Sequence, residues 1–322
     1  MRIVLCYLAE SRHTKQIEHV VPGMDVIDAG QDSVARQILD ADIFCGHPKV
    51  PMPWDAVVAK GRLKWIQGSS SGIDHCLVPS VVNSEIVVTS ASGVFANQVA
   101  EHTVAILCGL VRSLPTFIRA AQQKDFTRRP TRDLHGATVG IVGFGGNGQR
   151  IAELLAPFHT RILATDMFPY AQPLPSHVES VWAADRLDEL LPLVDVLILC
   201  VPLTDATQGM IDGGALARMK PGAILVNVAR GQVVVERDLI DVLRSGHLGG
   251  AALDVTEIEP LPKNSPLWEM PDVVITPHVG AQSATRFDEV TNFFCENLER
   301  YLAGQPLKNL VDKKLGFPLK DR

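Results

Sequence analysis

Short apolar runs alternate with helical stretches along most of the chain. In the first hundred residues the apolar runs predict strands, and two of the stretches between them, at 33–41 and 54–60, predict helices. Alternating strands and helices are typical of parallel β-α-β units, because a helix is the usual connection between parallel strands. The predicted strands of this part are residues 3–8, 43–45, 63–66 and 86–89.

A second alternation of the same kind begins near residue 138 and continues to residue 276. Helical stretches separate its apolar runs, for example at 216–219 and 236–245. This pattern predicts a second α/β unit. Its predicted strands are residues 138–142, 161–165, 194–200, 224–228, 251–255 and 273–276.

Two longer helical patterns, at 97–113 and 283–302, flank the second unit, and a polar connector at 124–134 contains Pro130. The simplest arrangement inserts the second unit into the first. We therefore expect an α/β protein with two Rossmann-like or flavodoxin-like domains. Residues 1–100 plus 284–322 form the outer, discontinuous domain, and residues 101–283 form the inserted one.

The composition is that of an ordinary globular protein. Of the 322 residues, 46% are hydrophobic and 20% charged, which excludes wholesale disorder. The formal charge is −6, and the isoelectric point is near 5.9. Because phosphates are bound mainly by cationic side chains, nucleic acids and acidic membranes are not expected as main partners. A small anionic substrate stays open, since one local arginine can bind it.

The cysteines and the lengths of the apolar runs indicate in which cellular compartment the protein is expected. No two of the six cysteines form a C-x-x-C motif, so we expect reduced thiols in a cytoplasmic protein and no metal site. No apolar run approaches about 18 residues, the length of a membrane-spanning helix. The N-terminus lacks the pattern of a signal peptide.

A glycine-rich segment follows the predicted strand 138–142. Gly143-Phe-Gly145-Gly146-Asn147-Gly148 matches the G-x-G-x-x-G pattern and opens a predicted helix. The first glycine permits a tight turn, the second lets the backbone approach a pyrophosphate, and the third lets helix and strand pack closely. The helix N-terminus offers N–H groups to phosphate. The context predicts a dinucleotide-binding turn.

Asp166 ends the next predicted strand, 18 residues after Gly148. A carboxylate at this point accepts hydrogen bonds from both ribose hydroxyls of the adenosine and repels a 2′-phosphate. Met167 and Phe168 follow it, without an Arg or Lys to receive that phosphate. The sequence therefore favours NAD over NADP.

Three polar residues of catalytic type follow other predicted strands of the second unit. Arg230 can fork onto a carboxylate, and His278 can exchange a proton near neutral pH. Glu259 can stabilise the charged histidine. Taken singly, they are also typical of surface ion pairs and of a structural histidine. Because ligands of open α/β sheets bind at the carboxyl ends of strands, the three together predict an active site.

These segments together resemble the D-isomer-specific 2-hydroxyacid dehydrogenases over nearly the whole chain. The order Arg, Glu, His, with spacings of 29 and 19 residues, fits that family's catalytic set. The family's split architecture agrees with the domains predicted above. The matching segments are Val99-Ala-Glu-His-Thr103, Gly143–Gly148, Asn227-Val-Ala-Arg-Gly231, Leu253-Asp-Val255 with Glu259-Pro260, and Pro277-His-Val-Gly280.

The resemblance implies roles for individual residues. Arg230 holds the substrate carboxylate and carbonyl oxygen, His278 is the acid/base, and Glu259 is its hydrogen-bonded partner. It also implies a homodimer, in which residues 97–134 reach the second copy. The implied substrate-binding residues are Ser70, Ser71, Gly72, Arg230 and His278. The implied cofactor-binding residues are Ser71, Gly143, Gly145, Gly146, Asn147, Gly148, Asp166, Val201, Val228, Ala229, Asp254 and Gly280.

The expected activity is NAD-dependent hydride transfer between nicotinamide and C2 of a small 2-keto or D-2-hydroxy acid. Glyoxylate, hydroxypyruvate, pyruvate and 3-phosphoglycerate-type substrates stay open, and no appended regulatory domain is expected. A phosphite dehydrogenase shares the Arg, Glu, His set, whereas formate dehydrogenases have glutamine in place of Glu259. A dinucleotide-sensing corepressor on the same fold is an alternative of another class.

The remaining histidines receive no catalytic role from the sequence. His102 and His247 are interpreted as structural or solvated. His47 and Lys49 are interpreted as loop residues, with selection of the substrate as their alternative role.

Overall fold

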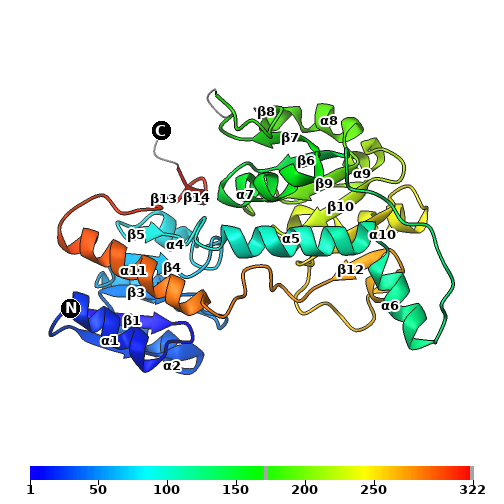
Figure 1. Cartoon of the computed structure of the whole chain (residues 1–322). Helices are drawn as coiled ribbons and strands as arrows, with labels where there is room; N and C mark the ends of the chain where they lie inside the picture. Colours follow the sequence, from blue (N-terminus) through cyan, green and yellow to red (C-terminus); the bar gives the residue numbers. More distant parts are fainter. Residues whose placement is uncertain (170–172, 320–322) are drawn as a thin grey trace. The chain divides into compact units, whose positions relative to one another are not determined.

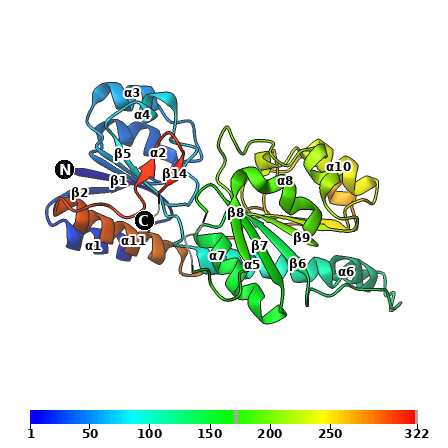
Figure 2. The same ribbon diagram turned by 90° about the horizontal axis from the view of Figure 1, so that it is seen from above.

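The computed structural model describes residues 1–169 and 173–319. Residues 170–172 of the expected inserted domain and 320–322 of the expected outer domain lie outside the described residues. The chain divides into two compact units (Figures 1 and 2), which we call unit 1 (Met1–Phe95 and Ser283–Arg322) and unit 2 (Ala96–Gln282). The divisions fall after residues 95 and 282, where 100 and 283 were expected.

Unit 2 contains a seven-stranded parallel sheet. In spatial order the strands are β12 (Val273–Ile275), β11 (Gly250–Leu253), β10 (Ile224–Asn227), β9 (Val196–Leu199), β6 (Thr138–Val142), β7 (Arg161–Asp166) and β8 (Ser180–Ala183). The chain starts at β6, adds β7 and β8 on one side, and then crosses to β9 on the other. Ligands of doubly wound sheets bind where the order reverses, which is here between β6 and β9.

Helices cover both faces of this sheet. Successive side chains of a strand point to opposite faces, and in β9 Val196 and Ile198 pack with α5 and α7, whereas Leu197 and Leu199 pack with α9 and α10. The helices are α5 (Ala96–Val111), α6 (Leu114–Gln122), α7 (Gly146–Leu155), α8 (Leu187–Leu190), α9 (Gly213–Arg218) and α10 (Glu236–Arg244). The 3₁₀ turns are η2 (Ala156–Phe158), η3 (Ala184–Arg186), η4 (Leu191–Leu193), η5 (Gly231–Val233) and η6 (Pro266–Glu269).

Unit 1 contains a five-stranded parallel sheet of flavodoxin-like order. In spatial order its strands are β2 (Asp25–Asp28), β1 (Arg2–Cys6), β3 (Ile43–Gly46), β4 (Trp65–Gly68) and β5 (Val87–Thr89). Its other elements are α1 (Ser11–Val20), α2 (Gly30–Gln37), η1 (Ile38–Asp40), α3 (Trp54–Lys60), α4 (Pro79–Val82), α11 (Arg286–Leu302) and the antiparallel pair β13 (Val311–Asp312) and β14 (Phe317–Pro318). The two sheets confirm the predicted fold class.

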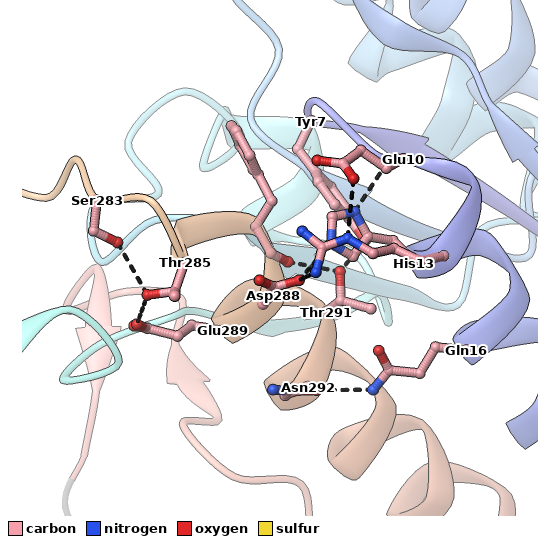
Figure 3. Close-up of polar contacts among 12 residues, drawn as sticks. Tyr7, Glu10, His13, Gln16, Ser283, Thr285, Asp288, Glu289, Thr291 and Asn292 are labelled. Atoms are coloured by element: carbon pink, nitrogen blue, oxygen red, sulfur yellow. Dashed lines mark hydrogen bonds and ion pairs between the residues drawn. The ribbon is translucent and has the colours of Figure 1, made fainter.

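Helix α11 belongs to unit 1 because it packs along α1 (Figures 1 and 2). Figure 3 shows the polar contacts between these helices and the end of β1. The buried His13 places Nε2 2.8 Å from Asp288 Oδ1, and the Tyr7 hydroxyl lies 3.0 Å from Thr291 Oγ1. These contacts hold the N-terminal and C-terminal segments of the chain together in unit 1, although unit 2 lies between them in the sequence.

Among the elements that the structure describes, those without a counterpart among the predictions include β2, β8, α1 and α6. The strands β2 and β8 lie at the edges of their sheets and are at most half-buried, so they lack a long apolar run. Helix α1 buries only His13 and Ile17, and α6 only Ala120. Hydrophobic patterning detects buried faces, and these elements have small ones.

Among the described residues, no single helix is both long and apolar enough to cross a membrane; α5 and α6 meet that length and composition only as a pair, bent by 65°.

Candidate functional site

The carboxyl ends of the unit 2 strands carry the predicted catalytic residues and all the predicted cofactor-binding residues except Ser71. They follow six neighbouring strands of one sheet, so they lie along one edge. Gly143–Gly148 follow β6, Asp166 ends β7, Val201 follows β9, Val228, Ala229 and Arg230 follow β10, Asp254 and Glu259 follow β11, and His278 and Gly280 follow β12.

The glycine-rich turn joins β6 to the N-terminus of α7. Gly143 has φ +90°, which side chains rarely tolerate, and a Cβ there would lie 2.9 Å from the backbone of Cys200. A Cβ on Gly148 would lie 2.3 Å from Gly143 O, so close packing of helix and strand requires glycine. No atom lies within 4 Å of the Cβ position of Gly145, the N-cap of α7. The turn is thus closely packed at Gly143 and Gly148, and it leaves space at Gly145.

The Asp166 carboxylate lies against this turn. Its Oδ2 accepts a hydrogen bond from the Phe144 N–H at 2.7 Å, and its Oδ1 accepts one from the Phe168 N–H at 2.9 Å. Phe144 stands between the first two glycines of the motif, so the structure brings the acidic residue and the glycine-rich turn together. A carboxylate can accept about four hydrogen bonds, which leaves capacity for ribose hydroxyls.

His278 and Glu259 form a hydrogen-bonded pair at the same edge. His278 Nδ1 lies 2.8 Å from Glu259 Oε2, and Glu259 Oε1 accepts a hydrogen bond from the Thr256 N–H at 3.3 Å. Burial raises the pKa of Glu259, but the His278 contact, the Thr256 N–H and the charge of Arg230 outweigh it, so the pKa lies below its ordinary value. Glu259 is therefore ionised at neutral pH.

The backbone at Arg230 is held by the side chain of Asn227, the last residue of β10. Asn227 Nδ2 donates to Arg230 O at 3.0 Å, and Asn227 Oδ1 accepts from the Ala229 N–H at 3.0 Å. Arg230 Nη1 donates to Ala229 O at 2.8 Å. The positive charge of the guanidinium contributes to the lowered pKa of Glu259.

Asp254 is the centre of a network that the sequence did not reveal. It is 3% exposed, and its Oδ1 and Oδ2 accept hydrogen bonds from the Val279 and Gly280 N–H groups at 2.9 and 2.8 Å. His102 of α5 places Nε2 3.2 Å from Asp254 Oδ1. These contacts agree with the interpretation of His102 as a structural histidine, and they place its ring against a predicted cofactor-binding residue. The only signal in the sequence was its place in the Val99–Thr103 motif.

The predicted substrate loop belongs to unit 1, where it follows β4. The Ser70 hydroxyl donates to Gly72 O at 2.7 Å and lies 3.0 Å from His47 Nδ1. Since the hydroxyl proton is used on Gly72, His47 Nδ1 is the donor to Ser70. Ser71 Oγ lies 3.5 Å from Ala91 O. His47 thus contacts the predicted loop, and the roles of Ser70, Ser71 and Gly72 stay predictions.

The residues of unit 2 fit a dinucleotide. The open position at Gly145 and the first N–H groups of α7 suit a pyrophosphate, and the Asp166 carboxylate beside the turn suits a ribose. Among the residues that the structure describes, no group of three His, Cys, Asp or Glu side chains is arranged to hold a metal ion.

Comparison with known proteins identifies the family. The sequence model for the family described as "D-isomer specific 2-hydroxyacid dehydrogenase, NAD binding domain" matches residues 104–280, more than half of the chain. The chain belongs to the D-isomer specific 2-hydroxyacid dehydrogenases. This membership confirms the family, the fold class and the oxidoreductase class predicted from the sequence.

Individual members of the family are similar over most of the chain. The glyoxylate reductase of Pyrococcus furiosus is 35% identical over 265 residues, which cover 79% of this chain and 77% of that protein. The D-3-phosphoglycerate dehydrogenase of Mycobacterium bovis is 31% identical over 284 residues, which cover 88% of this chain but 53% of that protein. The chain thus spans about half the length of that dehydrogenase.

Solved structures of this dehydrogenase family share the fold. A D-isomer specific 2-hydroxyacid dehydrogenase from Xanthobacter autotrophicus, in complex with NADPH and MES, superposes with a TM-score of 0.83 at 28% identity, covering 98% of this chain and 99% of that one. The inserted unit of our chain is therefore a nicotinamide-dinucleotide-binding domain. That relative is in complex with NADPH, so the fold by itself does not distinguish the two dinucleotides.

Proposed function

We propose that this dehydrogenase interconverts small 2-keto acids and D-2-hydroxy acids, with NAD as its cofactor and Arg230, Glu259 and His278 as its catalytic residues. The observation that carries the proposal is the 2.8 Å contact between His278 Nδ1 and Glu259 Oε2, on the sheet edge that also carries the glycine-rich turn. An acid/base pair and a dinucleotide cradle on one edge are the two parts that this chemistry needs.

The orientation of His278 assigns its two nitrogens. Glu259 is ionised and has no proton to donate, so Nδ1 of His278 carries the hydrogen of their hydrogen bond. The other nitrogen, Nε2, is then the atom that gives the proton to the substrate oxygen and takes it back. This is the same division of labour between the two ring nitrogens as in other carboxylate–histidine pairs.

Arg230 binds the substrate and polarises it. A guanidinium presents a planar fork of N–H donors that matches a carboxylate, and it stays protonated because its pKa is above about 12. Donors from Arg230 to the carbonyl oxygen stabilise the negative charge that grows there during reduction. A bound nicotinamide would supply the hydride that C2 gains in reduction and would accept it in oxidation. His278 would give the substrate oxygen its proton in reduction and take it back in oxidation.

The NAD preference rests on Asp166. Its carboxylate lies beside the turn, and residues 167–177 contain no Lys or Arg to neutralise a 2′-phosphate. We expect Asp166→Ala to weaken NADH binding and to raise the ratio of NADPH to NADH use, because a ribose acceptor and a repulsive charge disappear together. Kd values for both dinucleotides, measured by quenching of protein fluorescence, check this. Equal loss of both cofactors would contradict the assignment.

A panel of 2-keto acids tests the activity. We expect turnover with NADH on glyoxylate, hydroxypyruvate or pyruvate, and a D-configured product on the two longer substrates. Phosphite with NAD belongs in the same panel, because it tests the alternative with the same catalytic set. Tight binding of NADH without turnover of any substrate would instead favour a dinucleotide-sensing protein.

A homodimer and a cytoplasmic location complete the proposal. Helix α6 and the connector after it expose apolar side chains, with Leu114 49% and Ile118 59% exposed and Phe126 fully so. Apolar groups this exposed favour contact with a second copy. Light scattering should give twice the chain mass of 35.0 kDa, and a measured mass equal to that of one chain would exclude the dimer.

All six cysteines are free thiols, which supports the proposed cytoplasmic location, because the cytoplasm is a reducing compartment.

A further inference from the structure

The loop that carries His278 is fastened to one buried carboxylate. The backbone oxygen of Asp254 accepts a hydrogen bond from the His278 N–H at 2.8 Å. The Asp254 carboxylate accepts three more, from Thr276 Oγ1 at 2.7 Å, the Val279 N–H at 2.9 Å and the Gly280 N–H at 2.8 Å. Residues on both sides of His278 are therefore bound to the same aspartate.

The backbone of His278 needs this support. Its φ is +53°, in the left-handed region that residues other than glycine rarely adopt. Such a conformation persists only where the surrounding structure holds it. The four hydrogen bonds to Asp254 provide that hold, and the conformation directs the imidazole to Glu259.

His102 contacts the same oxygen of the Asp254 carboxylate, Oδ1, that Thr276 and Val279 contact. Its Nε2 lies 3.0 Å from Thr276 Oγ1 and 3.2 Å from Asp254 Oδ1. The Thr276 hydroxyl has one hydrogen, which it donates to Asp254, so it accepts from His102 and His102 Nε2 carries a hydrogen. His102 thus donates to the two side chains that hold the loop, and it does so from α5, which packs on the sheet.

We propose that His102 is a positioning residue for His278, which it serves by clamping Asp254 and Thr276 against the loop 276–280. The inference rests on the proposed function, because it assigns His278 the acid/base role. Neither the family membership nor the predicted site residues assign a part in the reaction to His102.

Asp254 is a buried carboxylate, and its charge makes the hydrogen bond from His102 important for its position. Burial raises its pKa, but the hydrogen bonds from His102, Thr276, Val279 and Gly280 outweigh burial and lower the pKa to about 2. A buried anion depends on each of its donors. Without the imidazole of His102, Asp254 and Thr276 can shift, and the His278 loop shifts with them. The other charged groups at this edge are Glu259, which contacts His278, and Arg230, whose charge acts on Glu259.

Two substitutions separate the hydrogen bond from the packing. His102→Leu removes the donor and fills the space, whereas His102→Gln can place an amide N–H near the position of Nε2. His247→Leu is the matched control, because His247 also lies in unit 2 and its ring also makes a polar contact, between Nε2 and Met219 O at 3.0 Å.

For His102→Leu we expect a roughly 10- to 100-fold loss in kcat for reduction, the scale of a small misplacement of a reacting group. The Kd of NADH should change less, and the alkaline limb of the pH–rate profile should move to lower pH, because the His278 imidazolium loses its close contact with Glu259. His102→Gln should restore most of kcat, and His247→Leu should leave both readouts unchanged.

Titration of the His278 ring by NMR, in protein with labelled histidines and no substrate, tests the positioning without any turnover. His278→Gln assigns the signal. A titration curve that moves to lower pH in His102→Leu and returns in His102→Gln supports the proposal. An unchanged titration curve in His102→Leu overturns the proposal. Equal loss of kcat in His102→Leu and His102→Gln, with a lower Tm and no shift of the titration curve, also overturns it. If the wild-type protein turns over no substrate, the proposed function fails, and the NMR titration decides the clamp alone.

Discussion

The replacement Glu259→Gln tests the charge on which the proposed proton transfer depends. Glutamine keeps the size of the side chain and a carbonyl acceptor for His278 Nδ1, but it removes the negative charge. The side chains of His278 and Glu259 are 46% and 39% exposed, so water screens their attraction. A pair this exposed contributes about 0.2–1 kcal/mol. Since roughly 1.4 kcal/mol corresponds to one pH unit, we expect the pH–rate profile to shift by about 0.1–0.7 pH unit.

The sign of the shift follows from the roles of the two groups. The Glu259 carboxylate favours the imidazolium form of His278, and reduction uses that form as its acid. The alkaline limb of the reduction profile should therefore move down, and the acid limb of the oxidation profile, which reports the neutral form, should move down with it.

Initial rates in both directions, measured at saturating cofactor across neutral and alkaline pH, check this prediction. Glu257→Gln is the matched control, because it removes the same charge from an exposed side chain two positions away. We expect the Glu257 profile to overlay the wild-type profile. A Glu259→Gln profile with an unmoved limb would refute the coupling between Glu259 and His278. Equal shifts in both variants would assign the effect to net charge instead of contact.

Two further predictions concern His278 and Asp254. His278→Ala should lower kcat by roughly 10²–10⁴, the range for a lost acid/base, with little change in the Kd of NADH, and intact turnover would disprove the mechanism. The pKa of Asp254 falls from 3.8 to about 2 on folding, which contributes about 2 kcal/mol of stability at neutral pH. Because a depressed pKa stabilises the protein above the unfolded value, this contribution should vanish as pH falls from about 4 to about 2. Urea unfolding of the wild type and Asp254→Asn should therefore show a stability gap that narrows in acid; a gap independent of pH would contradict the assigned ionisation.

Local patterns in the sequence were enough to predict the core of both sheets. The strands β6, β9, β10 and β11 are buried along their whole length, so each appears in the sequence as a continuous apolar run. The alternation of such runs with helical periods predicts parallel β-α-β units, because few other topologies accommodate it. The glycine-rich turn was equally local, since its glycines, its strand and its helix are contiguous.

The common edge of the sheet also follows from the sequence. Arg230, Glu259 and His278 each follow a predicted strand, and parallel strands place their carboxyl ends together. Their order and spacing resembled the family's catalytic set; the family model matches residues 104–280, and the roles of the three residues stay predictions. The distance between His278 and Glu259 was not predictable, because it depends on how the loops after β11 and β12 fold.

The tertiary structure alone decided the contacts that join distant segments. His102 and Thr276 are 174 residues apart in the sequence, and no periodicity relates a histidine on α5 to a loop after β12. The edge strands β2 and β8 are defined by backbone pairing with β1 and β7, which requires no apolar run. Hydrophobic patterns report which side chains leave water, whereas a hydrogen bond between buried polar groups forms only after packing has brought its partners together.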